Sequence, residues 1–269
     1  MRPNSFIFTL FGDFVHQAGE VNDALWVGTL VRLMASFGLS EQAVRQGISR
    51  MTRQGWLLPS RQGNRAFYAV TPHGRRRIEE LSPRIYGAAP PWDGKWRMLT
   101  YNVRESSRER RDKLRKDLTV LGWAPLSAST WISPMNALEA AREAAEINGI
   151  LGEIELFVSK NEGPRTDREL LEYCWNLPQI AQAYRGFLEH YAPRLERELA
   201  KAALTDEDAF VERLRLVYDF RKFAYLDPGL PTELLPADWP GIQAASLFRN
   251  YYEAIRKKST RFFEIARAS

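Results

Sequence analysis

The stretch SEQAVRQGISRMTRQG at residues 40–55, followed directly by WLLPSRQGNRAFYAVT at residues 56–71, decides the fold of the N-terminal part of the chain. Ser40 is a good helix N-cap and apolar residues recur after it at helical spacing, so the first string predicts a helix. The second string predicts two short strands joined by a turn that contains Gly and Asn. A short turn at residues 37–39 precedes this helix, and the combination is typical of a winged helix-turn-helix.

Helices are also predicted on both sides of this stretch. SFIFTLFGDFVHQAG (residues 5–19) and ALWVGTLVRLMASFG (residues 24–38) carry apolar residues three and four positions apart, as core-facing helices do. Thr71 and Pro72 form a helix start, and that helix is expected to end near residue 86. The prolines and glycines of GAAPPWDG at residues 87–94 then indicate a stiff linker.

The middle of the chain alternates strands and helices. We predict a strand at 95–103, a helix at 106–121, two short strands within 122–134, a helix at 135–148 and a strand at 152–159. This βαββαβ order suits a ferredoxin-like sheet.

Beyond residue 163 the pattern is almost entirely helical. Helices are expected near 167–176, 178–201, 205–224 and 241–266, and capping boxes at Ser106/Glu109, Thr166/Glu169 and Thr205/Asp208. LDPGLPTELLPADWPG (residues 226–241) lies between the last two helices, and its four prolines predict a stiff, shaped loop. The chain is therefore predicted to be α+β, with a winged helix-turn-helix domain at 1–90, a ferredoxin-like middle domain at 91–163 and a helical domain at 164–269.

The charge of the chain is uneven. The 269 residues carry a net charge of +5, and residues 1–90 hold all of the excess, with 11 Lys or Arg against 6 Asp or Glu. A basic first segment is expected if it meets a polyanion such as DNA. The single Cys174 excludes an intramolecular disulfide. The first apolar stretch is interrupted by Asp13 and fits neither a signal peptide nor a membrane span, so a cytoplasmic protein without membrane contact is expected.

One face of the 40–54 helix has the residue types that read bases. At 100° per residue, Val44, Ile48 and Met51 form an apolar stripe. The opposite side carries side chains suited to hydrogen bonds with base edges in the major groove: Gln42, Arg45, Gln46, Ser49 and Arg53. Arg61 and Arg65 flank the predicted hairpin turn, where they would reach phosphates or the minor groove.

Signatures of catalysis are sparse. The three histidines are scattered, and we find neither a metal-ligand spacing, nor a glycine-rich phosphate loop, nor a nucleophile elbow. The highly charged stretch at 104–117 pairs acids with bases four residues later, as a solvated helix does. We therefore expect a protein that is not an enzyme, with no catalytic residues, no metal and no resident cofactor. Several aromatic residues of the C-terminal segment would suit either an apolar pocket or core packing: Tyr173, Trp175, Tyr184, Tyr218, Phe220, Phe223, Tyr225 and Trp239.

Taken together, these residues resemble the PaaX-type repressors, which regulate phenylacetic acid degradation in bacteria. The resemblance covers nearly the whole chain: the opening SFIFTLFGDFV, the middle βαββαβ unit and above all DPGLPTELLPADWPG. It implies a homodimeric transcriptional repressor of phenylacetate catabolism genes that binds double-stranded operator DNA with two half-sites. It also implies release by an aryl-acyl-CoA effector such as phenylacetyl-CoA. Arg221, Lys222, Phe223 and Trp239 are candidates for binding that effector, the cations through its phosphates and the aromatics through its acyl end.

The middle unit is also similar to small CRISPR-associated nucleases of ferredoxin-like fold, which place a metal-binding Asp after a Tyr at the end of the first strand. In this chain Asn102 follows Tyr101, and its uncharged amide argues against a bound divalent cation. A metal-dependent nuclease is the alternative function, and a CoA-using enzyme with an attached DNA-binding domain is a second rival. A role in dimerisation is favoured for this unit.

Overall fold

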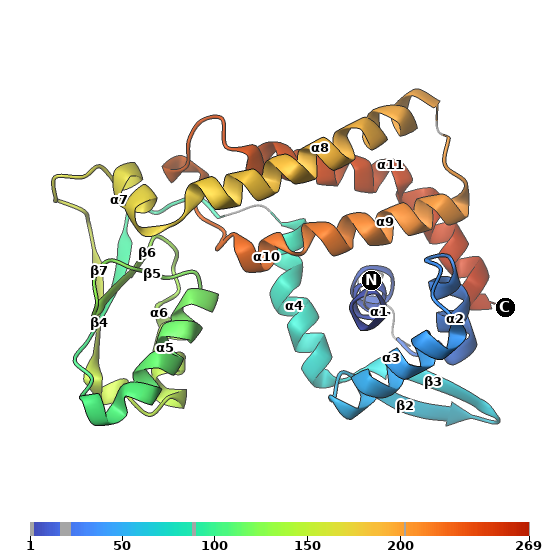
Figure 1. Cartoon of the computed structure of the whole chain (residues 1–269), viewed down its shortest axis with the longest axis horizontal. Helices are drawn as coiled ribbons and strands as arrows, with labels where there is room; N and C mark the ends of the chain where they lie inside the picture. The colour runs from blue at the N-terminus through green and yellow to red at the C-terminus, as the bar shows by residue number, and fades with distance from the viewer. Residues whose placement is uncertain (1–2, 17–22, 88–89, 202, 269) are drawn as a thin grey trace. The chain divides into compact units, whose positions relative to one another are not determined.

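The computed structural model describes residues 3–16, 23–87, 90–201 and 203–268. It is an α+β protein in which helices are combined with two small antiparallel sheets (Figure 1). The chain divides into two compact units. The first contains Met1–Gly87, Arg185–Lys222 and Ile242–Ser269, and the second contains Ala88–Tyr184 and Phe223–Gly241. The helices of the C-terminal segment are therefore shared between the units, while the three predicted domains stay a prediction.

The N-terminal part of the first unit follows the predicted order of elements with one addition, a short strand at residues 25–26 that lies within the predicted helix at 24–38 and pairs with residues 67–68. These elements are α1 (Pro3–Leu10), the π-helical η1 (Phe11–His16), β1 (Leu25–Trp26), α2 (Val27–Ala35), α3 (Glu41–Arg53), β2 (Leu57–Gln62), β3 (Arg65–Val70) and α4 (Pro72–Tyr86). The strands form an antiparallel sheet in the order β1-β3-β2. Ser40 caps α3 by accepting the Ala43 N–H at 3.3 Å. Gly38, with φ of 72°, makes the left-handed turn between α2 and α3.

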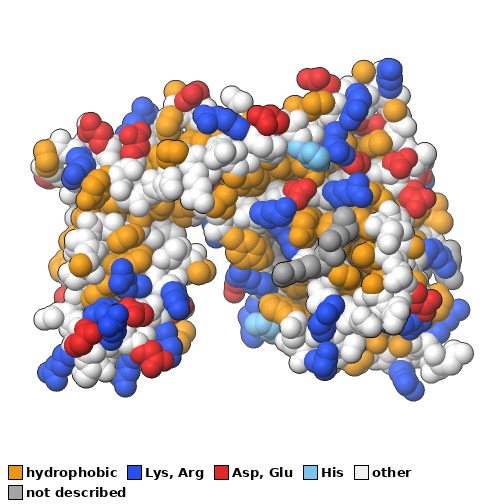
Figure 2. Space-filling model, viewed as in Figure 1, with side chains coloured by type: hydrophobic (Ala, Val, Ile, Leu, Met, Phe, Trp, Pro, Cys, Tyr) orange, Lys and Arg blue, Asp and Glu red, His pale blue; other side chains and the backbone are white. Residues whose placement is uncertain are grey.

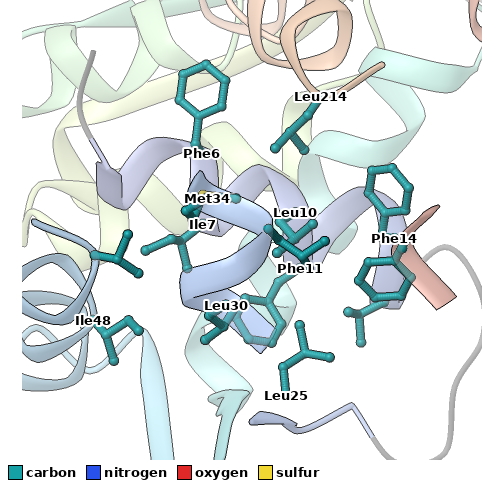
Figure 3. Close-up of a cluster of buried hydrophobic side chains, with 14 of the residues drawn as sticks. Phe6, Ile7, Leu10, Phe11, Phe14, Leu25, Leu30, Met34, Ile48 and Leu214 are labelled. Atoms are coloured by element: carbon teal, nitrogen blue, oxygen red, sulfur yellow. The ribbon is translucent and has the colours of Figure 1, made fainter. Parts of the chain in front are cut away.

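Helices from the C-terminal half complete the core of this unit. These helices are α9 (Asp206–Phe220) and the parts of α8 (Leu177–Lys201) and α11 (Pro240–Ala268) that lie in the first unit. Phe210, Leu214 and Phe263 are buried in the same cluster as the apolar faces of α1, α2 and α3. Figure 3 shows Leu214 beside the buried side chains of α1. Phe6 of α1 also stacks on Tyr218 of α9, with ring centroids 4.4 Å apart. The first helix is therefore covered only when α9 and α11 are in place.

The second unit contains the predicted βαββαβ arrangement. Its elements are β4 (Trp96–Tyr101), the 3-10 turn η2 (Glu105–Ser107), α5 (Arg108–Val120), β5 (Ala124–Pro125), β6 (Thr130–Ser133), α6 (Leu138–Ile147), η3 (Leu151–Glu153) and β7 (Ile154–Ser159). The sheet has the order β5-β6-β4-β7, and every neighbouring pair is antiparallel. Leu99, Leu114 and Ala141 are fully buried in the core formed by the sheet, α5 and α6. This arrangement fits a ferredoxin-like fold.

The proline-rich segment packs within the second unit. It contains α10 (Phe223–Leu226) and the 3-10 turn η4 (Thr232–Leu234), and Pro240 begins α11. Glu233 accepts the Trp92 N–H at 3.2 Å, and its carbonyl accepts hydrogen bonds from Arg168. Gly122 has a φ of 85°, and a Cβ at this position would lie 3.0 Å from Pro228 Cβ. We call residues 223–241 the strap, and these contacts show that it packs closely against the rest of the second unit.

The three predicted capping boxes have different outcomes. Thr166 and Glu169 form a complete capping box at the start of α7 (Asp167–Cys174). Thr205 caps α9 by accepting the Asp208 N–H at 3.1 Å. The prediction for Ser106 and Glu109 is wrong, because Ser106 lies inside η2, and Ser107, which makes no side-chain cap bond, takes the N-cap position of α5.

Candidate nucleic-acid interface

The residues predicted to read DNA lie on one exposed side of α3. Val44, Ile48 and Met51 are buried beneath the helix. The polar face of α3, as we call the opposite side, consists of five exposed residues: Gln42, Arg45, Gln46, Ser49 and Arg53. The helix thus presents hydrogen-bond donors and acceptors to solvent along its length.

The partner of Arg45 in the described part of the chain is Glu41 of the same helix. Its Nε donates to Glu41 Oε1 at 2.7 Å, and the two side chains keep 53% and 58% of their exposure. An exposed pair at this helical spacing contributes about 0.3–0.5 kcal/mol. Arg45 can therefore leave Glu41 at low cost when a stronger acceptor, such as a base edge, is offered.

On the side opposite its polar face, α3 makes a close contact with α1. Gly47 is buried where α3 crosses α1, and a Cβ there would lie 3.0 Å from Asn4 Oδ1 and 3.2 Å from Pro3 Cβ. The absence of a side chain lets the two backbones approach each other. The position of α3 is therefore fixed closely against α1 at this point.

The β2–β3 hairpin places two arginines next to its tip. Gly63, with φ of 59°, and Asn64 make the turn, while Gln62 pairs with Arg65 and Arg61 with Ala66. The Arg65 guanidinium lies over the Trp26 ring at 4.6 Å, which orients it. No ion pair or side-chain hydrogen bond joins Arg61 to another residue of the described part of the chain. Both arginines are exposed, so the hairpin carries positive charge outward.

The structure adds basic residues that the predicted set lacks. Arg50 and Arg76 are exposed, and within the described ranges neither has an acidic partner. Arg75 pairs with Asp23 and Arg77 with Glu80. At 100° per residue, Arg50 lies beside the predicted polar face of α3, so a prediction that also took the adjacent exposed position would have contained it. Figure 2 shows several basic side chains over the region where Figure 1 places α3 and the hairpin.

The four residues predicted to bind an acyl-CoA fall into two pairs. Arg221 and Lys222 belong to the first unit and lie over the Tyr218 ring, each 5.0 Å from its centroid. Phe223 and Trp239 belong to the second unit and are 8% and 4% exposed. Core packing against one residue explains this second pair, because Tyr184 stacks on Phe223 at 4.0 Å and meets Trp239 edge-on at 6.2 Å.

Two cavities in the first unit are small. Arg221 lines one of about 30 Å³ together with Thr9, Ile85 and residues near them. The other measures about 180 Å³ and is lined in part by His16 and Arg75. Sites for drug-sized ligands measure about 300–1,000 Å³, so neither cavity has room for an acyl-CoA in this conformation.

Comparison with known proteins places the whole arrangement in one family. Three family models match in succession: PaaX-like protein at residues 2–74, PaaX protein central Cas2-like domain at 89–171, and PaaX-like protein C-terminal domain at 175–265. The transcriptional repressor PaaX of Escherichia coli (strain K12) is 32% identical over 265 residues, covering 96% of this chain and 82% of that protein. The chain belongs to the PaaX family.

A solved structure shares the fold of this PaaX-family chain. The uncharacterized protein Rv0674 from Mycobacterium tuberculosis aligns with a TM-score of 0.58 and 23% identity, covering 88% of this chain and 89% of that one. The fold is thus recognisable at a sequence identity too low to carry function.

In the Cas2-like domain of this PaaX-family chain, Asn102 follows Tyr101, the last residue of β4. Asn102 is exposed after β4, and its backbone N–H donates to the Glu153 carbonyl at 2.9 Å. Among the residues that the structure describes, no three His, Cys, Asp or Glu side chains gather as they would around a metal. Burial raises the pKa of Cys174 to about 11, so its thiol is a poor nucleophile at neutral pH. None of the described helices is both long and apolar enough to span a membrane.

Proposed function

We propose that this chain is a DNA-binding transcriptional repressor of genes for phenylacetate breakdown. The observation that carries the proposal is the exposed polar face of α3, set beside a basic hairpin in a chain related to a named transcriptional repressor. In this proposal α2 and α3 are the two helices of a winged helix-turn-helix, and β2 and β3 are its wing. Such a protein acts in the cytoplasm, where the DNA is.

The residues of α3 divide the work of recognition by their chemistry. Arg45 and Arg53 would pair with guanine through two parallel hydrogen bonds, and Gln42 and Gln46 would pair with adenine. Ser49 is short enough to bring the helix close to the base edges. Arg61 and Arg65 would bind backbone phosphates or the minor groove, which fixes the position of α3 in the major groove without reading sequence.

Regulation is proposed to act through geometry. A homodimer would place its two recognition helices at half-sites one helical turn, or a multiple, apart. An aryl-acyl-CoA such as phenylacetyl-CoA would stabilise a different dimer geometry and release the operator. Moving the repressor from mostly bound to mostly free requires the effector to favour the released geometry by about 5 kcal/mol. Arg221 and Lys222 remain candidates for binding its phosphates through charge.

Fluorescence anisotropy on a labelled duplex from upstream of the chain's own gene tests the proposal. Wild-type protein should bind this duplex in preference to a scrambled one, and Arg45→Ala should weaken specific binding by about 1–3 kcal/mol. Arg142→Ala is the matched control: Arg142 lies on α6, is also 53% exposed and also pairs with a nearby Glu, in this case Glu139. The absence of any preference for the upstream duplex would refute the proposed function.

The effector and the dimer are tested on the same complex. Phenylacetyl-CoA should lower the anisotropy at concentrations where free phenylacetate and free coenzyme A do not. A duplex cut to one half-site should bind more weakly than the intact operator if the protein binds as a dimer. If none of the three compounds releases the DNA, the proposal of a repressor stands, but the proposal that phenylacetyl-CoA is its effector is refuted.

A metal-dependent nuclease is the second candidate, because the middle of the chain matches a Cas2-like domain. The uncharged side chain of Asn102 disfavours a bound divalent cation and therefore a metal-dependent nuclease. Incubation of labelled DNA and RNA with the protein and Mg²⁺ or Mn²⁺ distinguishes the two functions. Cleavage that disappears in both EDTA and Asn102→Ala would favour the nuclease.

A further inference from the structure

A buried ion pair lies where η1, the continuation of the first helix, meets three later helices. Asp13 of η1 has no exposed side-chain surface, and Arg213 of α9 has 5%. Arg213 Nε donates to Asp13 Oδ2 at 2.8 Å. The hydroxyls of Tyr86 and Tyr252 both donate to Asp13 Oδ1, at 2.8 and 2.9 Å. We call these four residues the Asp13 cluster. One carboxylate thus binds side chains from α4, α9 and α11.

The other donors of Arg213 are also used. Its Nη2 donates to the Tyr252 hydroxyl at 2.7 Å, its Nη1 donates to Thr260 Oγ1 at 3.0 Å, and its guanidinium lies 4.0 Å from the centroid of the Phe14 ring. Burial and the carboxylate of Asp13 raise the pKa of Tyr86 well above its ordinary value, so that hydroxyl stays protonated and donates. Apolar contacts tolerate a slide of one helix over another, but a satisfied buried network loses a partner when its members shift. The Asp13 cluster therefore selects one position of η1.

That position bears directly on the proposed DNA-reading helix. α1 runs into η1 without a break, and α1 meets α3 at the close contact around Gly47. On its other side α1 packs against α9, where Phe6 stacks on Tyr218. Tyr86 is the last residue of α4 and stands one residue before the end of the first unit's opening segment. The Asp13 cluster thus connects the end of α4, where the chain leaves the first unit, to η1 and through it to α1, which packs against α3.

We propose that Asp13 is a positioning residue for operator recognition. Through Arg213, Tyr86 and Tyr252 it locks α1, and with it α3, to the C-terminal helices α9 and α11. The orientation of the polar face of α3 is then set by the C-terminal helices and not by the winged helix-turn-helix elements alone. This inference rests on the proposed DNA-binding function, and its test separates the two.

A second buried network in the same unit supplies a matched control. Glu212, the neighbour of Arg213 in α9, is 8% exposed. It accepts hydrogen bonds from Arg194 Nη1 at 2.7 Å and from the Tyr251 hydroxyl at 3.1 Å. These partners lie on α8 and α11, so the network has the same chemistry but reaches neither α1 nor η1. Glu212→Gln should lower stability without moving α3.

The test compares Asp13→Asn and Tyr86→Phe with Glu212→Gln in the full chain. Operator binding is measured by anisotropy, and amide hydrogen exchange of residues 40–54 is measured by mass spectrometry without DNA. Both readings are taken at the same interval below each variant's unfolding midpoint. Asp13→Asn should weaken binding to the upstream duplex by about 2- to 30-fold and speed exchange in 40–54. Tyr86→Phe, which removes one hydroxyl, should weaken operator binding and speed exchange in 40–54 to a smaller extent. If Asp13→Asn does not fold, the result for Tyr86→Phe tests the inference.

Two results overturn different claims. If Asp13→Asn and Tyr86→Phe match Glu212→Gln in both operator affinity and exchange of 40–54, the Asp13 cluster is a purely structural element and the inference fails. If wild-type protein shows no preference for the upstream duplex, the proposed function fails. In that case the exchange data alone decide whether the Asp13 cluster positions α3.

Discussion

Trp239→Ala should unfold the second unit at a much lower denaturant concentration than wild type. Trp239 is 4% exposed and packs edge-on against Tyr184, which in turn stacks on Phe223. A Cβ at Gly241 would lie 2.5 Å from Trp239 Nε1, so the indole also fills the space beside the backbone. Truncation therefore opens a cavity in the strap formed by residues 223–241.

The size of the loss follows from the buried area. An aromatic side chain of this kind buries about 150–250 Å², which at about 25 cal/mol per Å² gives roughly 4–6 kcal/mol as an upper bound. Measured Trp→Ala changes in cores cost about 3–5 kcal/mol. We expect a loss in that second range. A Trp that instead lined an open ligand pocket would be partly hydrated, and its removal would cost about 1 kcal/mol or less.

Urea unfolding followed by circular dichroism measures the loss. Tyr225→Ala is the control, because Tyr225 is an aromatic residue of the same segment that is 61% exposed, and its removal should cost under about 1 kcal/mol. If Trp239→Ala costs no more than Tyr225→Ala, Trp239 is not a core residue and the packing argument is wrong. If it costs what we expect, a loss of acyl-CoA binding in Trp239→Ala cannot be assigned to ligand contact.

Three further predictions concern the hairpin, a helix cap and an ion pair. Arg61→Ala should weaken binding to operator and non-operator duplexes alike, and anisotropy across a salt series should show the slope of log Kd against log salt falling by about 1. Thr166→Ala should cost about 0.5–2 kcal/mol in urea unfolding through loss of the capping box, while Thr166→Ser should keep most of the stability. Hydrogen bonds from Arg97 lower the pKa of Asp93 below its ordinary 3.8, so this carboxylate stabilises the fold above that value and stops doing so as the pH falls through the lowered pKa. The stability difference between wild type and Asp93→Asn, from urea unfolding at neutral pH down to about pH 2, should therefore shrink in acid, and a difference that grows there would contradict the assigned pair.

Local signals in the sequence predict much of the fold. Ser40, the pair Thr71–Pro72 and the turn at Gly63–Asn64 act within a few residues of themselves, and the structure places helix starts and a hairpin turn at these positions. The βαββαβ order is also read directly from the alternation of periodicities. The predicted capping box at Ser106 was wrong because a 3-10 turn moves the start of α5 by one residue, and a rule based on residue spacing does not detect such a turn.

Long-range partners are what the sequence does not supply. The stretch at 5–19 reads as one amphipathic helix, yet its described part changes to a π-helix at Phe11 and buries Asp13 against a residue 200 positions away. The signal was present: a carboxylate inside an otherwise apolar run needs a buried partner. Likewise, Lys222 and Phe223 are adjacent in sequence, and only the tertiary contacts assign them to different units. The exposed face of α3 could be predicted because helical periodicity alone determines it.

The sharing of helices between the two units has a consequence for synthesis of the chain on the ribosome. The apolar faces of α1 and η1 share one core with Phe210, Leu214 and Phe263, which leave the ribosome long after residue 87. At about 5–20 residues per second, the interval is roughly 10 to 35 seconds. During that time an exposed set of Phe and Leu side chains must be kept from aggregating. For the same reason, an N-terminal fragment cut at residue 90 would lack part of its own core and is not expected to fold as it does in the whole chain.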